Sequence, residues 1–512
     1  MKLSELLLHI EPNTISGIER NGLGSQHDLE IGSIHYNAQD VKPGGLFVAI
    51  PGFVSDGHDF IDTAIENGAG AVIVQKPIDA DAIIIEVKNT RKALASLSSR
   101  FYGDPSEKLV VIGITGTNGK TTITFLLESI LSAAGYKTGV IGTINYRYAG
   151  KTFDNPRTTP ESLDLQRILS EMLQQKMTHV IIEVASHGIE LHRIDNTWID
   201  VGVFTNLTQD HLDFHGDIES YWACKKQLFT KNLRTGPKKE KAAAVINQDD
   251  PKGKELIHSL EMDSISIGIS GDNTVFCENF SLDLNGITGT ISTPGGNFTF
   301  SSDLIGKYNL ENILCAVGVG IALKISCEKI KEGIQAVPAI PGRLESIRNN
   351  IERYVYVDYA HTPDALKNVL TSLKNLATKK IICVFGCGGD RDQGKRPKMG
   401  KIAGELSDLA IITSDNPRTE PPFKIIEQIL EGTRSVISHE YKPEDLKNSF
   451  KKTGYVVEPD REKAITLGIM ASNPNDIVLI AGKGHETYQV LGTKTVPFDD
   501  RVMAEEALTV LN

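Results

Sequence analysis

The chain has 512 residues, which is enough for about three domains of ordinary size. Hydrophobic residues make up 40% of it and charged residues 23%, values that exclude a largely disordered protein. The 54 basic and 65 acidic residues give a net charge of −11, so no overall positive field attracts nucleic acid or anionic lipid. No apolar run approaches the ~18 residues of a membrane span. We therefore expect a cytoplasmic protein with no nucleic-acid partner and no membrane insertion.

The first part of the chain predicts a small α/β domain over residues 1–106. Its first ten residues include an acid within a short apolar stretch, which indicates an amphipathic helix and not a signal peptide. Apolar strands are expected at 44–50 and 69–74, with a helical segment between them. The six cysteines of the whole chain show no metal-site spacing and predict free thiols.

A second domain is expected over residues 107–338. Apolar strands at 109–115, 179–184, 201–207 and 242–246 alternate in part with helical segments. This alternation predicts a mostly parallel sheet covered by helices on both faces. The short alternating segments of 264–305 predict an antiparallel extension. A helical stretch at 308–336 then closes the domain.

The third domain, over residues 339–512, predicts another doubly wound, Rossmann-like sheet. Each predicted strand runs into a polar, turn-rich loop, and ligands of such sheets bind at the carboxyl ends of the strands. Four loops are therefore expected to meet at one site. The strands are expected at 354–358, 380–385, 409–414 and 477–481, and the loops begin near Asp358, Gly386, Asp415 and Gly482.

The strongest motif lies between the strand at 109–115 and the helix that follows it. Its glycines allow close approach to phosphates, and the start of the helix supplies N–H donors and a positive dipole end. Lys120 can reach the terminal phosphates, and the Thr121 hydroxyl suits Mg²⁺. The first glycine departs from the general P-loop spacing, but a plain strand-to-helix turn would not need this pattern. The motif, which predicts nucleoside triphosphate binding, consists of Gly116, Thr117, Asn118, Gly119, Lys120, Thr121 and Thr122.

Three further segments carry weaker signals. Glu183 ends an apolar strand, where a Mg²⁺ ligand of a P-loop protein belongs, although an exposed strand-end acid is the alternative. The His- and Asp-rich segment 210–216 is consistent with metal or phosphate chemistry, although lone histidines often only cap or pack. By its own pattern the segment 221–229 predicts an amphipathic helix that exposes Lys225 and Lys226.

Taken together, these segments resemble the Mur ligase family, the ATP-dependent amide ligases that build the stem peptide of peptidoglycan. The resemblance covers nearly the whole chain in the right order. It implies a uridine-nucleotide-binding domain, a central ATPase domain and a C-terminal Rossmann-like domain. The matching segments are Gly116–Thr122, Glu183–Gly188, Phe204–Leu207, Asp210–Gly216, Tyr221–Phe229, Gly306–Asn312 and Pro341–Glu345.

Within this family, the C-terminal segments are similar to those of the branch that adds meso-2,6-diaminopimelate to the D-glutamate of UDP-N-acetylmuramoyl-L-alanyl-D-glutamate. The implied reaction transfers the γ-phosphoryl group of ATP to the D-glutamate γ-carboxylate, and the amine then displaces phosphate. The alternatives are the same ligase with L-lysine as the amine, a nucleotide-binding module without catalysis, and a P-loop kinase. The segments are Asp358–Leu366, Phe385–Asp392, Ser414–Glu420 and Ala481–Glu486.

The resemblance assigns a role to each nucleotide-side residue. Catalysis is implied for Lys120, Lys225 and His211. Mg²⁺ is implied on Thr121, Glu183 and His211, together with Lys225 as a carbamylated lysine, because CO₂ converts its ammonium into an anionic oxygen ligand. ATP would be bound by residues 116–122, by Asn312 at the adenine, and by Arg343 and Asp358, which would close over the nucleotide.

The resemblance also implies the sites of the two other substrates. ATP and these two substrates are the only partners expected, and the enzyme is expected to be a monomer. Arg418, with Asn416 beside it, would bind the extra carboxylate that distinguishes diaminopimelate from lysine, since a guanidinium offers paired donors. Glu486 suits the ammonium end. Arg391, Asp415, Pro417 and Gly482 complete that site, and Thr158, Thr159 and Arg193 match positions that hold the UDP-dipeptide.

Two departures from the family pattern concern the uridine and dipeptide side. Asn37, Ala38 and Gln39 stand where an Asp-Ser-Arg stretch is usual, and Ala185 replaces a serine. Each change removes a hydroxyl, and a neutral hydrogen bond contributes about 0.5–1.5 kcal/mol. We expect a roughly tenfold effect on affinity from such a loss and no effect on the phosphate chemistry.

Overall fold

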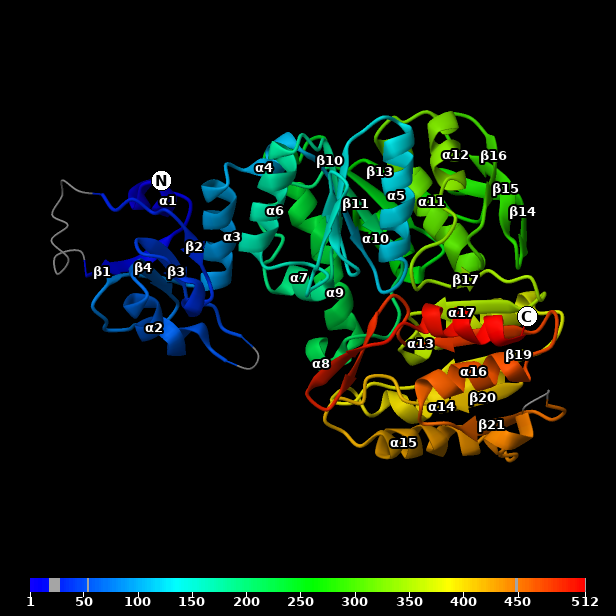
Figure 1. The fold of residues 1–512 in the computed structure, drawn as a ribbon. Helices are drawn as coiled ribbons and strands as arrows, with labels where there is room; N and C mark the ends of the chain where they lie inside the picture. Colours follow the sequence, from blue (N-terminus) through cyan, green and yellow to red (C-terminus); the bar gives the residue numbers. More distant parts are fainter. Residues whose placement is uncertain (18–27, 53–54, 447–449, 512) are drawn as a thin grey trace.

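A computed structural model describes residues 1–17, 28–52, 55–446 and 450–511 of the chain. They form an α/β protein in which three regions follow one another along the sequence, each with its own main sheet (Figure 1). The first region is blue in Figure 1, the second cyan to green, and the third yellow to red. Within the described part of the chain, no helix combines the length and the apolar character that a membrane span requires.

The first region is a five-stranded sheet in the order β1-β5-β4-β3-β2, in which only β1 runs antiparallel to its neighbour. Alternate residues of its strands pack on opposite faces, against α1 and α3 on one side and α2 on the other. The predicted N-terminal helix is present but short. The elements are α1 (Leu3–Leu7), β1 (Pro12–Ser16), β2 (Ile34–His35), η1 (Ala38–Asp40), β3 (Gly45–Val48), η2 (Gly57–Phe60), α2 (Ile61–Glu66), β4 (Ala69–Val74), β5 (Ile83–Val87) and α3 (Thr90–Phe101).

The second region contains an eleven-stranded sheet in the order β16-β15-β14-β13-β12-β11-β6-β10-β7-β8-β9. The strands from β14 to β7 in this order pair in parallel, and antiparallel hairpins extend both ends. The strands are β6 (Val110–Thr115), β7 (Thr138–Ile141), β8 (Tyr146–Tyr148), β9 (Lys151–Phe153), β10 (His179–Glu183), β11 (Val201–Phe204), β12 (Ala243–Asn247), β13 (Ser264–Gly268), β14 (Val275–Asp283), β15 (Gly286–Ser292) and β16 (Phe298–Ser302).

Helices cover both faces of this sheet, as the sequence predicts. Helices α5, α11 and α12 pack on one face, and α6 and α9 pack on the other. The helical stretch expected at 308–336 is two helices, because the chain turns after Leu323 and Ser326 caps the second helix by accepting the N–H of Lys329. The helices are α4 (Pro105–Lys108), α5 (Lys120–Ala133), α6 (Ser162–Gln174), α7 (Ser186–Glu190), α8 (Leu212–His215), α9 (Ile218–Thr230), η3 (Asn232–Arg234), α10 (Pro251–Ser259), α11 (Lys307–Ala322) and α12 (Cys327–Gln335).

The third region has a six-stranded sheet in the order β17-β18-β22-β19-β20-β21, in which only β17 is antiparallel, and a separate hairpin β23–β24. Helices α13, α14 and α15 cover one face, and α16 and α17 cover the other. The elements are β17 (Glu345–Ile347), β18 (Tyr354–Asp358), α13 (Pro363–Leu376), β19 (Ile381–Phe385), α14 (Lys395–Leu406), β20 (Leu409–Ile412), α15 (Pro422–Arg434), η4 (Pro443–Leu446), β21 (Gly454–Val457), α16 (Arg461–Ala471), β22 (Ile477–Ala481), β23 (Tyr488–Leu491), β24 (Lys494–Pro497) and α17 (Asp500–Leu511).

The order of the strands places the functional loops. The four strands predicted in the third region, β18, β22, β19 and β20, are consecutive neighbours in the sheet and pair in parallel. Their carboxyl ends therefore lie along one edge. The core of this region also takes in Ile305, with Leu284 and Tyr308 packed against it, from the second region. The two regions thus meet through apolar contacts as well as through the cleft described below.

Candidate active site

The loop between β6 and α5 is shaped by two glycines. Gly116 has φ +145° and Gly119 has φ +90°, conformations that other residues rarely adopt. A Cβ atom on Gly116 would lie 1.8 Å from the Oγ1 of Thr205, and one on Gly119 would lie 2.1 Å from the Oδ1 of Asn312. The loop backbone therefore runs directly against Thr205 and Asn312, and the latter is held by a 3.0 Å hydrogen bond to Asn309.

Two lysines converge on this loop. The Nζ atom of Lys120 donates to the carbonyls of Gly116 (2.9 Å) and Thr117 (2.8 Å), and the Nζ of Lys225 donates to the Gly116 carbonyl at 2.8 Å. Lys225 is only 1% exposed. Burial lowers the pKa of both ammonium groups, and the charge of Lys120 helps to bring the pKa of Lys225 well below its usual value.

The burial of Lys225 contradicts the helix-pattern expectation that both lysines of α9 are exposed. Lys225 lies one turn after Tyr221 and three residues before Leu228, so it falls within the buried stripe of the helix. Lys226 points to the other side, where its side chain is 29% exposed and lies 3.7 Å from Glu255. A lysine inside an apolar stripe is the sequence signal that distinguishes the two residues.

Glu183 ends β10 beside the loop and is 1% exposed, so the alternative of an exposed strand-end acid is wrong. Its Oε1 accepts hydrogen bonds from the Thr121 hydroxyl and the Thr143 backbone N–H, both at 3.0 Å. Its Oε2 accepts one from the Thr143 hydroxyl at 2.8 Å. Thr143, which sequence reasoning missed, therefore clamps this carboxylate. The preceding Gly142 leaves room for it, since a Cβ there would lie 2.4 Å from Oε1.

His211 precedes α8 and sits at the edge of the loop with a side chain that is 45% exposed. Its Nε2 lies 3.5 Å from Asp210, and its ring meets that of His187 edge to face at 4.8 Å. Burial, together with the charges of Lys120 and Lys225, lowers its pKa, whereas Asp210 opposes the shift. The imidazole is therefore neutral near pH 7, the form that can ligate a metal.

The third region reaches the nucleotide loop through Arg343. The guanidinium of Arg343 donates to the Thr121 hydroxyl at 3.4 Å and lies 4.9 Å from the centre of the Tyr359 ring. Asp358 is buried and accepts the backbone N–H of Leu344 (2.6 Å) and of Ala360 (2.8 Å). Burial raises its pKa. The structure thus gives Asp358 the task of fixing the backbone next to Arg343.

A cleft of about 1470 Å³ lies between the second and third regions. All four predicted loops of the third region contribute to its wall, together with Thr158 and the segment around His211 from the second region. Of the residues assigned to the amine by resemblance, all but Pro417 line this cleft. Those residues are Arg391, Asp415, Asn416, Arg418, Gly482 and Glu486.

The charged groups of this cleft are held in different ways. Arg418 has φ +52°, and its Nη1 donates to the carbonyl of Gly389 at 2.8 Å. Asn416 donates from Nδ2 to Glu486 Oε2 at 2.9 Å. Arg391 is exposed and touches only the carbonyl of the preceding Asp390, at 3.4 Å, among the described contacts. Arg418 supplies a cation and Glu486 an anion, and this pair of charges suits a zwitterionic amino acid.

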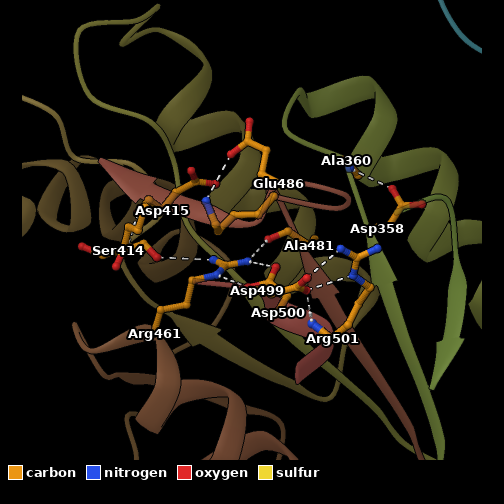
Figure 2. A network of polar contacts seen from close by, with 12 residues as sticks. Asp358, Ala360, Ser414, Asp415, Arg461, Ala481, Glu486, Asp499, Asp500 and Arg501 are labelled. Atoms are coloured by element: carbon orange, nitrogen blue, oxygen red, sulfur yellow. Dashed lines mark hydrogen bonds and ion pairs between the residues drawn. The ribbon is translucent and has the colours of Figure 1, made fainter. Parts of the chain in front are cut away.

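A buried ion pair beneath the cleft ties two of its loops together (Figure 2). Arg461 and Asp500 are fully buried, and the Nε and Nη2 of Arg461 each lie 2.7 Å from a carboxylate oxygen of Asp500. Arg461 also donates to the carbonyls of Ser414 (3.3 Å) and Ala481 (3.0 Å). These carbonyls immediately precede Asp415 and Gly482. Sequence reasoning missed this pair, because an isolated arginine at a helix start carries no signal.

The residues assigned to the UDP-dipeptide are only partly in the cleft. Thr158 lines it and lies 3.1 Å from the Thr143 hydroxyl. Thr159 is 1% exposed and bonds the carbonyl of Glu183 (2.8 Å) and the N–H of Ala185 (3.0 Å). Arg193 is also buried, and pairs with Glu161 at 2.9 Å. These two side chains therefore have partners within the protein.

In the first region, Asn37 and Ala38 carry no hydroxyl group, and both have a structural role instead. The Oδ1 of Asn37 caps η1 by accepting the N–H of Gln39 at 3.3 Å, and Ala38 is 4% exposed. All six cysteines are free thiols, as expected.

Comparisons with known proteins agree with this architecture. Three family models match in succession: the Mur ligase family catalytic domain over residues 30–102, the Mur ligase middle domain over 114–320, and the Mur ligase glutamate ligase domain over 342–484. The UDP-N-acetylmuramoyl-L-alanyl-D-glutamate--2,6-diaminopimelate ligase of Geobacter metallireducens is 45% identical over 503 residues, which cover 98% of this chain and 97% of that one. The Geobacter sulfurreducens protein of the same name is 44% identical over 512 residues, 99% of this chain and 98% of its own.

Solved structures give the same result. A structure of a UDP-N-acetylmuramoyl-L-alanyl-D-glutamate--2,6-diaminopimelate ligase is 30% identical with a TM-score of 0.70, and the match covers 100% of this chain and 99% of that one. A MurF ligase from Thermotoga maritima, solved in complex with ADP, shares the fold at 21% identity and a TM-score of 0.63, with coverage of 94% and 98%. From the matching models and the high identity over nearly the whole length, the chain belongs to the Mur ligase family.

Proposed function

We propose that this chain is an ATP-dependent amide ligase that adds meso-2,6-diaminopimelate to the D-glutamate of UDP-N-acetylmuramoyl-L-alanyl-D-glutamate, a step of peptidoglycan precursor synthesis. The observation that carries the proposal is the single cleft that joins His211, beside the nucleotide loop, to Arg418 and Glu486. The names of the relatives at 45% and 44% identity support diaminopimelate over L-lysine. The extra carboxylate of diaminopimelate needs a guanidinium, which Arg418 supplies.

The chemistry required is activation of a carboxylate. A carboxylate is a poor electrophile, so the γ-phosphoryl group of ATP is transferred to it, and the amine then attacks the acyl phosphate through a tetrahedral intermediate and expels phosphate. Two anions must approach one another in the first step. Lys120 supplies positive charge beneath the phosphates, the loop N–H groups bind phosphate oxygens, and Arg343 contributes a second cation from the third region.

The residues around Thr121 fit a divalent cation that prefers oxygen ligands. The Thr121 hydroxyl and the Glu183 carboxylate are 3.0 Å apart, and a neutral His211 lies at the edge of the same loop. Bound there, Mg²⁺ would neutralise phosphate charge during the transfer. Among the described residues no cluster of three His, Cys, Asp or Glu side chains could hold a metal by itself. We propose that a further anion completes the set.

A carbamate on Lys225 supplies that anion. The lowered pKa of Lys225 favours its neutral amine, and a neutral amine is the form that attacks CO₂. An N–C bond forms as one C=O electron pair of CO₂ moves to oxygen, one proton leaves the nitrogen, and the neutral amine becomes a carbamate with an anionic oxygen ligand. The contact of the unmodified Nζ with the Gly116 carbonyl supports this proposal, because the amine lies against the phosphate loop.

In this proposal each of the three regions binds one substrate. Residues 1–106 bind the UDP moiety, residues 107–338 bind ATP, with Asn312 at the adenine, and residues 339–512 bind the amino acid. Thr158, Thr159 and Arg193 lie on the dipeptide side, and the last two act through their contacts with Glu183, Ala185 and Glu161. The proposed enzyme is a monomer. A cytoplasmic location belongs to the proposal, because the reaction consumes ATP.

Trapping with hydroxylamine tests the acyl phosphate. The protein is incubated with ATP, Mg²⁺ and the UDP-dipeptide, without any amine substrate, and with hydroxylamine as the competing nucleophile. A hydroxamate that appears in proportion to ADP is the expected result. A phosphorylated product that hydroxylamine does not consume would indicate a kinase, and absence of ADP formation would indicate a module without catalysis.

Removing the Thr143 hydroxyl is expected to weaken Mg²⁺ use. In a Thr143→Val variant, Glu183 loses one of its three hydrogen bonds, worth about 0.5–1.5 kcal/mol, so the Mg²⁺ concentration for half-maximal activity should rise by roughly 2–10-fold. Thr138→Val, on the strand β7 that precedes Thr143, is the matched control, because the Thr138 hydroxyl has no hydrogen-bond partner in the described structure. An unchanged Mg²⁺ requirement for Thr143→Val would remove Thr143 from the site.

A further inference from the structure

Lys483 is a fully buried lysine of the third region. It follows β22 and lies in sequence between Gly482 and Glu486, which both line the cleft, and its own side chain is 0% exposed. Its Nζ donates to Asn416 Oδ1 at 3.2 Å, to Glu486 Oε2 at 3.1 Å and to the backbone carbonyl of Tyr488. Each of its three protons thus has an acceptor, as a buried ammonium requires.

Both polar atoms of the Asn416 side chain form hydrogen bonds within the protein. Its Nδ2 donates to Glu486 Oε2, and its Oδ1 accepts from Lys483 and from the backbone N–H of Val490 at 3.0 Å. The amide oxygen is therefore committed to the protein, whereas Nδ2 keeps a second N–H, and Asn416 lines the cleft. Glu486 keeps one oxygen, Oε1, without a hydrogen bond in the described structure, and that oxygen remains available to a ligand.

Lys483 is also connected, through the hairpin β23–β24, to Arg418, the cation of the amine site. Its contact with the Tyr488 carbonyl fixes the start of the hairpin β23–β24, and Asn416 fixes Val490 in the same strand. That hairpin holds the backbone of Arg418, whose N–H donates to Val490 at 3.1 Å and whose carbonyl accepts from Gly492 at 2.8 Å. Arg418 keeps its unusual positive φ within this frame.

We infer that Lys483 is a positioning residue for the amine substrate. It orients Glu486 toward the ammonium group and, through Asn416 and the hairpin, holds Arg418 in place for the carboxylate, so the two charges stand at a fixed separation. That separation selects amino acids whose ammonium and carboxylate groups match it. This inference rests on the proposed ligase function.

The test replaces the ammonium by an apolar group of similar length. For Lys483→Met, the KM for diaminopimelate is expected to rise by about 10–100-fold, the loss typical of charge-assisted hydrogen bonds. The KM for ATP is expected to stay unchanged, because the nucleotide loop lies on the other side of the cleft. Lys483→Gln, which keeps an N–H donor without the charge, is expected to give an intermediate KM for diaminopimelate.

Lys238→Met is the matched control. Lys238 is also largely buried, with a side chain 14% exposed, and pairs with Asp200 at 2.6 Å, but it contacts Leu109 at the opposite end of β6 from the nucleotide loop. This variant should lose thermal stability without any change in KM. Calorimetric titration with diaminopimelate and with ADP gives a second readout, in which Lys483→Met and Lys483→Gln should lose affinity for diaminopimelate alone.

The outcomes separate the two proposals. Wild-type protein that turns over ATP without using diaminopimelate would overturn the proposed function itself. Wild-type protein that uses diaminopimelate, together with a Lys483→Gln or Lys483→Met protein that binds ADP normally and has an unchanged KM for diaminopimelate, would overturn only the role of Lys483. An equal rise in the KM for all substrates would show a merely structural role, and would also contradict the inference.

Discussion

Replacing Lys225 by alanine is expected to abolish ligation while leaving the fold intact. The side chain is buried against the carbonyl of Gly116, and the proposed carbamate on it would be one of the few anions available to the Mg²⁺ site. Removal of one well-placed electrostatic group from an active site costs about 10²–10³-fold in rate, and the loss of a metal ligand adds to that. Phosphate release and circular dichroism, measured in parallel, check activity and fold.

Chemical rescue makes this prediction specific to the carbamate. Short-chain carboxylates such as acetate or propionate can enter the space left by the side chain and supply an oxygen anion, so they should restore part of the activity of Lys225→Ala. Lys226→Ala is the control on the same helix, since Lys226 is half-buried and only approaches Glu255. It should remain active. A Lys225→Ala protein with full activity would contradict the carbamate proposal.

Replacing Arg418 by alanine is expected to weaken the use of diaminopimelate by about 10–100-fold in kcat/KM, because a hydrogen bond to a charged group contributes about 1.5–3 kcal/mol. Among the described contacts, only the Nη1 of the guanidinium donates to the protein, to the Gly389 carbonyl. Its other donors have no partner in the described structure and can bind a carboxylate. Arg418→Lys should recover only part of the loss, since an ammonium cannot present two parallel N–H groups.

Steady-state kinetics with varied diaminopimelate measure this effect. Arg434→Ala is the control, because Arg434 is an arginine of α15 with a side chain 49% exposed and an ion pair to Glu427 at 3.5 Å. Its kcat/KM should match that of the wild type. If Arg418→Ala retained the wild-type kcat/KM for diaminopimelate, Arg418 would not be part of the amine site.

Much of the fold could be predicted, because buried parallel strands are continuous apolar runs bounded by glycine-rich or polar turns. Four of the strands that the sequence did not indicate, β8, β9, β17 and β21, lie at or next to sheet edges and are three or four residues long. Short edge strands bury few residues and leave a weak pattern. The segment 264–268 was expected to be antiparallel, but β13 pairs in parallel with β12, because a pattern of alternation does not fix strand direction.

The parts of the candidate site that a sequence motif defines could be predicted. The parts that depend on tertiary contacts could not. The phosphate loop follows from local sequence. By contrast, Thr143 contacts Glu183, which is 40 positions away in the sequence. Arg461 contacts residues 20 and 47 positions away, and Lys483 contacts Asn416 at 67 positions. Their roles depend on which strands are neighbours, and no spacing along the chain encodes that. The burial of Lys225 is different, because its place in the apolar stripe of α9, between Tyr221 and Leu228, was a local signal that the helix-pattern interpretation overlooked.

The identity of the amine distinguishes the proposed ligase from the same ligase with L-lysine. The most direct test measures phosphate release from ATP in the presence of UDP-N-acetylmuramoyl-L-alanyl-D-glutamate, with meso-diaminopimelate and L-lysine compared side by side. Turnover that depends on diaminopimelate and is absent with lysine is the predicted result. Turnover with lysine would keep the ligase and contradict the role of Arg418, and no turnover with either amine would contradict the proposed function.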